Sequence, residues 1–272
     1  MQDNTNSKEF RRRAPIVRDR DREPSEAAEG VVYGRNEVRE LLRSGRSVDK
    51  IFVRRGDREG SINVILGMAA ERGIPIVEAE REKLDQLSAG GVHQGVVAMA
   101  AQKEYVEVED ILKIAEERGE MPLLVILDGV EDPYNLGAVI RCAECAGAHG
   151  IILPKRRATG LTATAAKASA GAIEHMAVAK VSNLAAEIDK LKERGVWLYA
   201  AEAGGEDLYT VDLNRPAAFV LGSEGSGVSR LVREKCDYTI SIPMYGKVNS
   251  MNVSTAAAVV LTEAAHRRHS HS

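Results

Sequence analysis

The sequence predicts an α/β protein with two domains, the second built on a parallel sheet. The chain has 272 residues, which at roughly 100 to 200 residues per domain is enough for two. From residue 122 onward, short apolar runs alternate with helical patterns, as in the strand–helix–strand units of a parallel sheet. Hydrophobic residues make up 44% and charged residues 28% of the chain. This composition is typical of soluble globular proteins, and no apolar run is long enough to span a membrane.

Residues 1–29 are expected to form a disordered tail. They contain seven basic and seven acidic residues but few large apolar ones, so they could not offset the entropy lost on folding. The segment has no apolar core of the kind found in secretory signal peptides. Three cysteines form no disulfide framework and suit a reducing compartment. We therefore expect a cytoplasmic protein with free thiols.

Residues 30–103 are expected to form a small α/β domain. Periodicity predicts helices over residues 36–42 and 61–72, and strands over residues 50–53, 74–77 and 95–100. Residues 30–58 hold eight basic and four acidic residues, an excess of +4 within a chain whose net charge is -3. Arg35, Arg39 and Arg43 are four apart and share one helix face. They form either a surface for an RNA phosphate backbone or a solvated face next to Glu37 and Glu40. Aromatic residues are only 4%, which argues against reading single strands by base stacking.

Residues 104–121 are expected to be a linker with one short helix around Ile111 and Ile114, and the second domain to span residues 122–268, with a tail over 269–272. Within that domain strands are predicted over residues 123–128, 150–153, 175–181, 196–201, 217–222 and 238–242, and helices over 137–146, 162–168, 183–194 and 253–266. The last helix is apolar on more than one face and must be buried all round. Its second apolar face would be covered either by a homodimer interface or by other parts of the same subunit.

Three unusual polar segments follow predicted strands, where ligands of parallel sheets bind. They are residues 128–141 (DGVEDPYNLGAVIR), 221–227 (LGSEGSG) and 242–254 (IPMYGKVNSMNVS). The glycine-rich segment lacks the spacing of a phosphate-binding loop, and the carboxylate of Glu224 would repel phosphate. A cofactor with a cationic portion fits it better. Asp128 is expected to cap the turn at Asp132 and Pro133.

In order and spacing, these segments resemble the three signature motifs of the SpoU (TrmH) family of S-adenosylmethionine-dependent RNA ribose 2′-O-methyltransferases, within the SPOUT superfamily. Residues 31–100, including Gly34-Arg35-Asn36 and His93-Gln-Gly-Val, resemble the L30e-like substrate-binding domain attached to many members. The arrangement most resembles members that methylate a guanosine of 23S rRNA; a tRNA substrate is the alternative. The resemblance implies a trefoil-knotted second domain and a homodimer whose cofactor pockets lie near the dimer interface.

The resemblance also assigns roles. Its motifs imply a catalytic set consisting of Asn135, Arg141, Glu224, Ser250 and Asn252. They imply S-adenosylmethionine contacts at Leu221, Gly222, Ile242, Met251 and the turn containing Ser169 and Gly171. No metal is expected. The family's arginine could act as the base for the ribose hydroxyl, but a guanidinium hardly deprotonates in proteins. Positioning and stabilisation of the alkoxide are therefore the preferred role.

Other signals are given structural interpretations. Cys142 and Cys145 form a C-x-x-C without a second ligand pair, so packing is preferred over zinc or redox chemistry. The histidines and arginines of residues 266–271 are expected to be an exposed, frayed end. Two other functions are alternatives for such a chain, a non-catalytic RNA-binding protein and a Rossmann-type nucleotide enzyme. The motif residues disfavour the first, and the late position of the glycine-rich loop disfavours the second.

Overall fold

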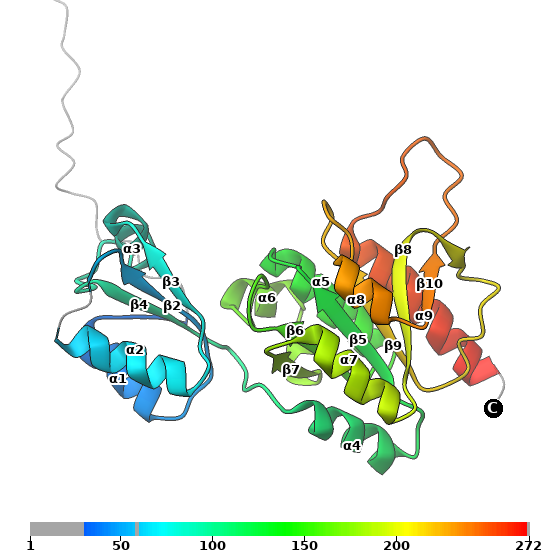
Figure 1. The fold of residues 1–272 in the computed structure, drawn as a ribbon, viewed down its shortest axis with the longest axis horizontal. Coiled ribbons are helices and arrows are strands. Elements are labelled where there is room, and N and C mark those ends of the chain that lie inside the picture. Colours follow the sequence, from blue (N-terminus) through cyan, green and yellow to red (C-terminus); the bar gives the residue numbers. More distant parts are fainter. Residues whose placement is uncertain (1–29, 58–59, 271–272) are drawn as a thin grey trace, which may run out of the picture.

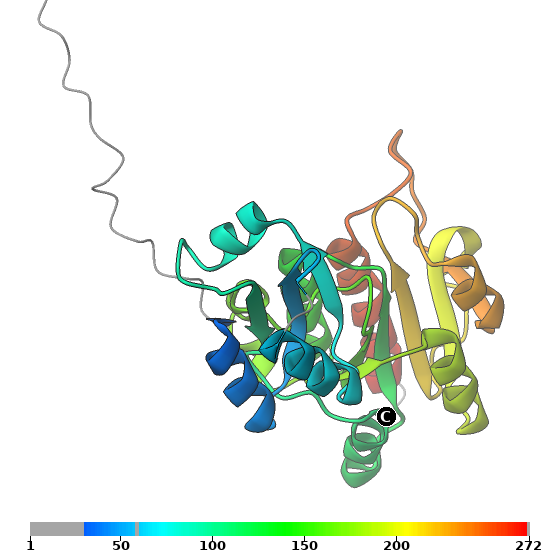
Figure 2. The same cartoon turned by 60° about the vertical axis from the view of Figure 1, so that its left-hand side comes forward.

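The computed structural model describes residues 30–57 and 60–270, which form two α/β domains, each with its own sheet (Figure 1). The tail expected over residues 1–29 lies outside the described residues. The mixed α/β class is confirmed. Figure 1 shows the first domain at the left and the larger sheet, with the C-terminal helix in red against it, at the right. In Figure 2 the first domain comes forward and overlaps the second.

The first domain is a four-stranded sheet of order β1-β4-β2-β3. Its elements are β1 (Val31–Tyr33), α1 (Arg35–Arg43), β2 (Val48–Arg54), α2 (Ser61–Glu71), β3 (Ile76–Ala79), α3 (Arg81–Leu87) and β4 (Val96–Ala100). β3 starts two residues later than expected. The sequence prediction missed β1, which has only three residues, and α3, which buries a single residue, Leu84. Isolated short elements give little periodic signal.

The predicted linker contains its expected helix, which packs on the second domain. α4 (Val108–Arg118) begins with a capping box between Glu107 and Asp110 and ends at Gly119 in the left-handed conformation. Its Ile111 is fully buried against Gly150, where any side chain would collide with it. Four apolar positions at helical spacing form the buried side of this helix, although the rest of the segment is charged.

The second domain is a six-stranded sheet of order β10-β8-β9-β5-β6-β7 in which every neighbouring pair is parallel, as predicted. Its elements are β5 (Leu123–Asp128), α5 (Pro133–Cys145), β6 (Gly150–Pro154), α6 (Ala163–Ala168), η1 (Ala172–Glu174), β7 (Ala177–Val181), α7 (Leu184–Glu193), β8 (Trp197–Asp207), β9 (Ala217–Gly222), α8 (Arg230–Lys235), β10 (Tyr238–Ser241) and α9 (Val253–Ser270).

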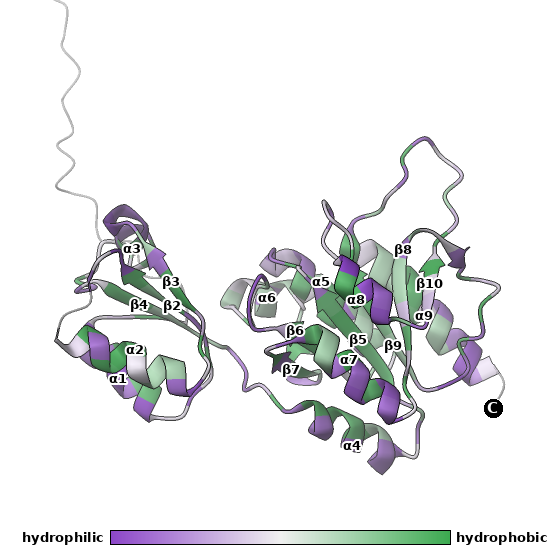
Figure 3. Cartoon of the chain, in the orientation of Figure 1, coloured by the Kyte–Doolittle hydropathy of each residue, from purple (hydrophilic) through white to green (hydrophobic). Residues whose placement is uncertain are grey.

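Helices cover both faces of this sheet, and the central strand shows why its sequence is continuously apolar. Leu123, Val125 and Leu127 of β5 pack in a core with α5, α6 and α9. The intervening Leu124 and Ile126 pack on the other face with α4, α7 and α8. Figure 3 shows the resulting hydrophobic strands between helices with polar outer surfaces. Successive strand residues point to opposite faces, so a strand covered twice has no polar positions.

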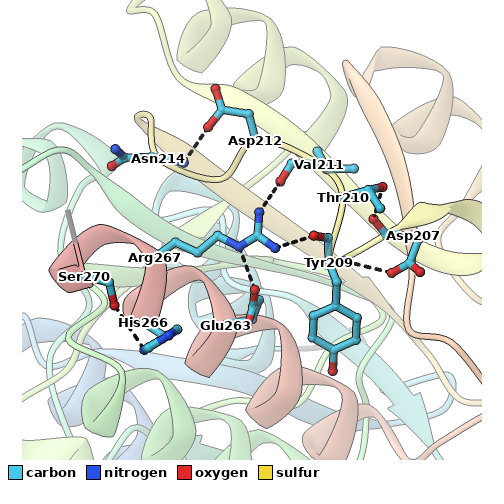
Figure 4. A network of polar contacts seen from close by, with 10 residues as sticks. All are labelled: Asp207, Tyr209, Thr210, Val211, Asp212, Asn214, Glu263, His266, Arg267 and Ser270. Atoms are coloured by element: carbon cyan, nitrogen blue, oxygen red, sulfur yellow. Dashed lines mark hydrogen bonds and ion pairs between the residues drawn. The ribbon is translucent and has the colours of Figure 1, made fainter.

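The C-terminal helix is longer and better anchored than expected. α9 runs to Ser270, and Arg267 donates hydrogen bonds to the carbonyls of Tyr209 (2.6 Å) and Val211 (2.8 Å) (Figure 4). Burial lowers the pKa of Arg268 to about 10, and its guanidinium donates to the carbonyls of Met121 and Pro122. The expectation of a frayed basic end is therefore wrong for these two arginines, which find carbonyl acceptors in the loops beside the helix.

α9 is not buried all round within one chain. Val253, Ala257, Val260, Leu261 and Ala264 are buried. Three further apolar residues of the helix, Ala256, Val259 and Ala265, are only half-buried.

A buried charge pair joins the two domains. Asp49 of β2 is fully buried and accepts a hydrogen bond from Lys180 of β7, 2.6 Å from Nζ to Oδ1. The hydroxyl of Tyr105 donates to the same carboxylate oxygen and accepts from the backbone N–H of Leu161 at 2.9 Å. Gly160 is needed here, because an added Cβ would lie 2.0 Å from the Asp49 carboxylate. The domains therefore touch through specific polar contacts and close packing.

Candidate functional site

The parallel register brings the three polar segments to one edge of the large sheet. β5 and β9 are neighbours that end level, with Asp128 paired to Gly222. β10 is separated from β9 by β8 and runs parallel to both. Its carboxyl end leads into residues 242–252 and then α9. Loops at the carboxyl ends of adjacent parallel strands must converge. This edge of the sheet is therefore the candidate site.

Asn135, Glu224 and Asn252, one residue from each segment, form a hydrogen-bonded cluster. The side-chain amide of Asn135 donates to Glu224 Oε1 at 3.0 Å. The amide of Asn252 donates to Asn135 Oδ1 at 2.9 Å and also to Glu224 Oε1. Asn252 Oδ1 in turn accepts from the backbone N–H of Ser254 at 2.8 Å, in the first turn of α9. These three residues, which the family motifs place in one site, are far apart in the sequence. The fold brings their side chains into contact.

The helix carrying Asn135 is fixed at its start. Asp132 caps α5 by accepting from the N–H of Tyr134 at 3.0 Å, and Pro133 occupies the first turn. The expectation that Asp128 caps this turn is wrong. Its carboxylate instead accepts from the N–H of Ser229 at 2.8 Å, beyond the glycine-rich loop. Asp128 thus ties the end of β5 to the far end of the loop that holds Glu224.

A second carboxylate that the sequence prediction missed anchors the same loop. Glu202 accepts from the N–H of Val228 at 2.8 Å and pairs with Arg233 at 2.8 Å. Gly227 packs against it with a φ of +64°, and an added Cβ would lie 2.6 Å from Glu202 Oε1. Glu202 follows the predicted strand 196–201, so searching the end of every predicted strand for polar residues would have found it.

A cavity of about 370 Å³ lies between the glycine-rich loop and the segment before α9. Four predicted cofactor residues line it together with predicted catalytic residues Ser250 and Glu224: Leu221, Gly222, Ile242 and Met251. Apolar side chains of Ile240, Val253 and Ala256 and the carboxylate of Glu202 complete much of the wall. The cavity combines an apolar surface with two carboxylates.

A second cavity, of about 470 Å³, adjoins the first. It is lined by Asn135, by the ends of β5 and by the serines of the glycine-rich loop. Arg157, from the loop after β6, also lines it and was missed by the sequence prediction. Glu224 lines both cavities, so the Asn135–Glu224–Asn252 cluster lies at their boundary.

Three predicted site residues are not brought to these cavities. Arg141 is exposed on α5, lines neither cavity and makes no hydrogen bond to the cluster among the described residues. Ser169 is fully buried and structural, since its hydroxyl donates to Ala166 O and accepts from the N–H of Ile173. Gly171 forms the adjacent left-handed turn at φ +92°. In the single chain this turn packs behind α5, where Gly137 allows close approach of Ser169.

The three arginines of α1 are less available than the helix pattern indicated. Arg35 pairs with Asp57 at 3.2 Å and donates to the carbonyl of Gln94 at 2.9 Å. Arg43 pairs with Glu40 at 2.8 Å, and Arg39 donates to Asn36 at 3.2 Å. Arg35 therefore organises the loop around residues 92–95, and the shared face is partly neutralised.

The described residues hold no group of three or more His, Cys, Asp or Glu side chains placed to bind a metal ion. Cys142 is half-buried and Cys145 exposed on α5, and burial raises the pKa of the Cys142 thiol. Across residues 30–57 and 60–270, no helix has the length and apolar character needed to cross a membrane.

Loops that converge on cavities at the carboxyl edge of a parallel sheet, in a chain with a separate small α/β domain, are the arrangement expected of an α/β enzyme. The model of the SpoU rRNA methylase family matches residues 122–262, and the model for the RNA 2′-O ribose methyltransferase substrate-binding domain matches residues 31–106. The chain belongs to the SpoU (TrmH) family of RNA methyltransferases.

Relatives and solved structures agree with this assignment. A Bacillus subtilis protein, named as a member of the TrmH family of tRNA/rRNA methyltransferases, is 48% identical over 238 residues, covering 87% of this chain and 95% of its own. An rRNA methyltransferase from Sinorhizobium meliloti, solved with AdoMet bound, is 23% identical with a TM-score of 0.53 and covers 88% of this chain and 87% of its own. A TrmH/SpoU tRNA-modifying enzyme from Aquifex aeolicus is 26% identical with a TM-score of 0.51, covering 60% and 84%.

Proposed function

We propose that this protein transfers a methyl group from S-adenosylmethionine to a ribose 2′-hydroxyl of RNA, with a guanosine of 23S rRNA as the substrate. The observation that carries the proposal is the position of Glu224, held by Asn135 and Asn252 at the boundary of two cavities. A group-transfer enzyme needs its two substrates side by side, with ordered polar side chains where they meet.

The donor set of the smaller cavity fits S-adenosylmethionine. Ile242 and Met251 would offer apolar surface to an adenine, and Glu224 would place negative charge near a sulfonium, whereas the charge of Glu202 is paired with Arg233. S-adenosylmethionine supplies an electrophilic methyl group when bound. Leu221, Gly222 and Ser250 would hold the rest of the cofactor. Ser169 and Gly171 support α5 from behind and are not part of this proposed binding set.

The chain's own residues orient and stabilise the ribose hydroxyl. Glu224 Oε2 makes no hydrogen bond to a described residue and is available to accept one from the hydroxyl, while the amide of Asn135 fixes the carboxylate. The oxygen gains negative charge as it attacks, and a guanidinium nearby would stabilise that charge. We assign this role to Arg141.

Arg141 lies outside both cavities of its own chain, and this supports a homodimer as part of the proposal. Ala256, Val259 and Ala265 of α9 are only half-buried. Beside them, the segment before α9 exposes Tyr245 by 97% and Val248 by 69%. A second copy packed on this surface would bury these side chains and enclose the site. The trefoil knot and the cytoplasmic location expected from the sequence belong to the same proposal.

The coverage of known structures supports rRNA over tRNA. The Aquifex aeolicus tRNA-modifying enzyme covers 60% of this chain, whereas the Sinorhizobium meliloti rRNA methyltransferase covers 88%. A tRNA substrate is the second candidate, because the Bacillus subtilis relative is named for both RNA classes.

Methyl transfer to unmodified transcripts tests the proposal. Purified protein with tritium-labelled S-adenosylmethionine is offered a 23S rRNA transcript or a pool of tRNA transcripts, and the labelled position is mapped by its resistance to alkaline cleavage. We expect one 2′-O-methyl group in 23S rRNA, lost in Glu224→Gln. Label on a base, or no label in either RNA, would refute the function, whereas label confined to tRNA would establish the second candidate.

A further inference from the structure

A groove of about 910 Å³ lies between the two domains and is lined by basic side chains from both. Lys50 comes from β2 of the first domain, and Lys155, Arg156 and Arg157 come from the loop after β6 of the second. Among the residues that the structure describes, no acidic one lines the groove. A concave surface with charge of one sign concentrates the field on an anionic ligand.

Within residues 30–57 and 60–270, no carboxylate neutralises these four charges. No salt bridge or hydrogen bond joins the side chains of Lys50, Lys155, Arg156 or Arg157 to any residue in those ranges. The α1 arginines Arg35 and Arg43, by contrast, have carboxylate partners at 3.2 and 2.8 Å. Cations without partners are available to bind phosphate.

The groove leads to the proposed methyl-transfer site through one residue. Arg157 lines the groove and also the 470 Å³ cavity that contains Asn135 and Glu224. Its φ of +53° is unusual for a residue other than glycine. Arg157 therefore belongs to the walls of both spaces.

The other wall of the groove offers apolar contacts at the edge of the small sheet. β3 is the terminal strand in the order β1-β4-β2-β3. Its Ile76 and Val77 line the groove and are 40% and 39% exposed. Such an edge beside a row of cations provides surface for sugars and bases next to sites for phosphates.

We propose that the interdomain groove binds the phosphodiester backbone of the substrate RNA and guides it to the target ribose. Lys50, Lys155 and Arg156 bind successive phosphates, and Arg157 positions the phosphate nearest the ribose that receives the methyl group. The proposal rests on the proposed function. It assigns the main RNA path to this groove rather than to the paired arginines of α1.

Salt-dependent RNA binding tests the groove. In the variant Lys50→Gln, Lys155→Gln, Arg156→Gln, we measure binding of the 23S rRNA transcript by filter retention over a NaCl series. Each phosphate contact on single-stranded RNA contributes about 0.7 to the slope of log K against log[salt], so the slope should become shallower by about 2. Affinity at about 0.1 M salt should fall on the order of 100-fold, with unchanged S-adenosylmethionine binding in calorimetry.

A matched control separates this groove from the protein's general charge. The control triple removes as many positive charges at exposed positions that line neither the groove nor the cavities: Lys113→Gln, Arg118→Gln and Arg230→Gln. We expect its slope to match the wild type. If the groove triple and the control triple give equal slopes, while the wild-type protein binds and methylates the RNA, the groove is not the RNA-binding surface. The proposed function would then stand without it.

Arg157 is tested separately as a positioning residue. Arg157→Gln should lower kcat by at least about tenfold while leaving the affinity for S-adenosylmethionine unchanged, because a misplaced ribose reacts slowly. Arg157→Lys should recover part of the rate, and the groove triple should instead raise KM for RNA. Wild-type kcat in Arg157→Gln would remove this residue from the proposal. A wild-type protein that methylates no RNA would refute the proposed function itself.

Discussion

Replacing Lys180 by methionine should destabilise the contact between the two domains. The Asp49 carboxylate has no exposed surface, and its Oδ1 lies 2.6 Å from Lys180 Nζ. Its Oδ2 is buried without a hydrogen bond. Without Lys180, the carboxylate keeps only the hydroxyl of Tyr105. Removing one partner of a buried ion pair costs about 3–5 kcal/mol, since the remaining charge stays desolvated.

That cost is a large part of the roughly 5–15 kcal/mol that stabilises a typical domain. We would measure the free energy of unfolding by urea titration, and cleavage near residues 101–107 by limited proteolysis. The double variant Asp49→Asn, Lys180→Met should recover much of the loss, because it leaves no unpaired charge. Arg230→Met is the control, since Arg230 forms an exposed pair with Glu234 and its loss should have little effect. If Lys180→Met unfolds and is cleaved like the wild type, the reasoning about this pair is wrong.

Three further predictions concern the second domain. Arg141→Ala should abolish methyl transfer without changing the circular dichroism spectrum, and wild-type turnover would reject its assigned role. Gly137→Val should lower the urea midpoint, with overpacking costing about 1–3 kcal/mol, because even a Cβ would lie 2.4 Å from the carbonyl of Ala165. Burial lowers the pKa of His149 below its usual value of 6.5. At pH values just below 6.5 the unfolded chain therefore binds a proton at this residue that the folded chain does not. The free energy of unfolding should fall as the pH drops below about 6.5. Urea titrations on both sides of that pH should show a weaker dependence in His149→Gln, and an unchanged dependence would contradict the assignment.

The outcome for the arginines of α1 shows how a helix pattern can mislead. Spacing by four places Arg35, Arg39 and Arg43 on one face, and a linear sequence gives no sign that Asp57 lies beside the first of them. In the fold, Asp57 reaches Arg35 from a turn after β2, 22 residues away. Charge that looks available in the sequence is partly neutralised by tertiary contacts. Lys155, Arg156 and Arg157 were overlooked because three adjacent residues in a loop have no periodic signal.

Local sequence determined the class of fold and most of its elements. Residues 123–127 (LLVIL) are apolar without interruption, the pattern of a strand covered on both faces, and this predicted the parallel sheet correctly. The three motifs, read together, also predicted the family and the cluster of Asn135, Glu224 and Asn252. These inferences depend on residue types and short spacings, which are properties of the sequence and do not depend on how distant segments pack.

The tertiary structure decided which side chains share a space. It packed the expected linker onto the sheet, anchored Arg267 and Arg268 on loop carbonyls, and placed Ser169 and Gly171 behind the site. It also set Lys50 across a groove from residues more than a hundred positions later. Proximity between distant segments depends on strand order and domain contacts. No local pattern encodes either, because each is the result of packing the whole chain.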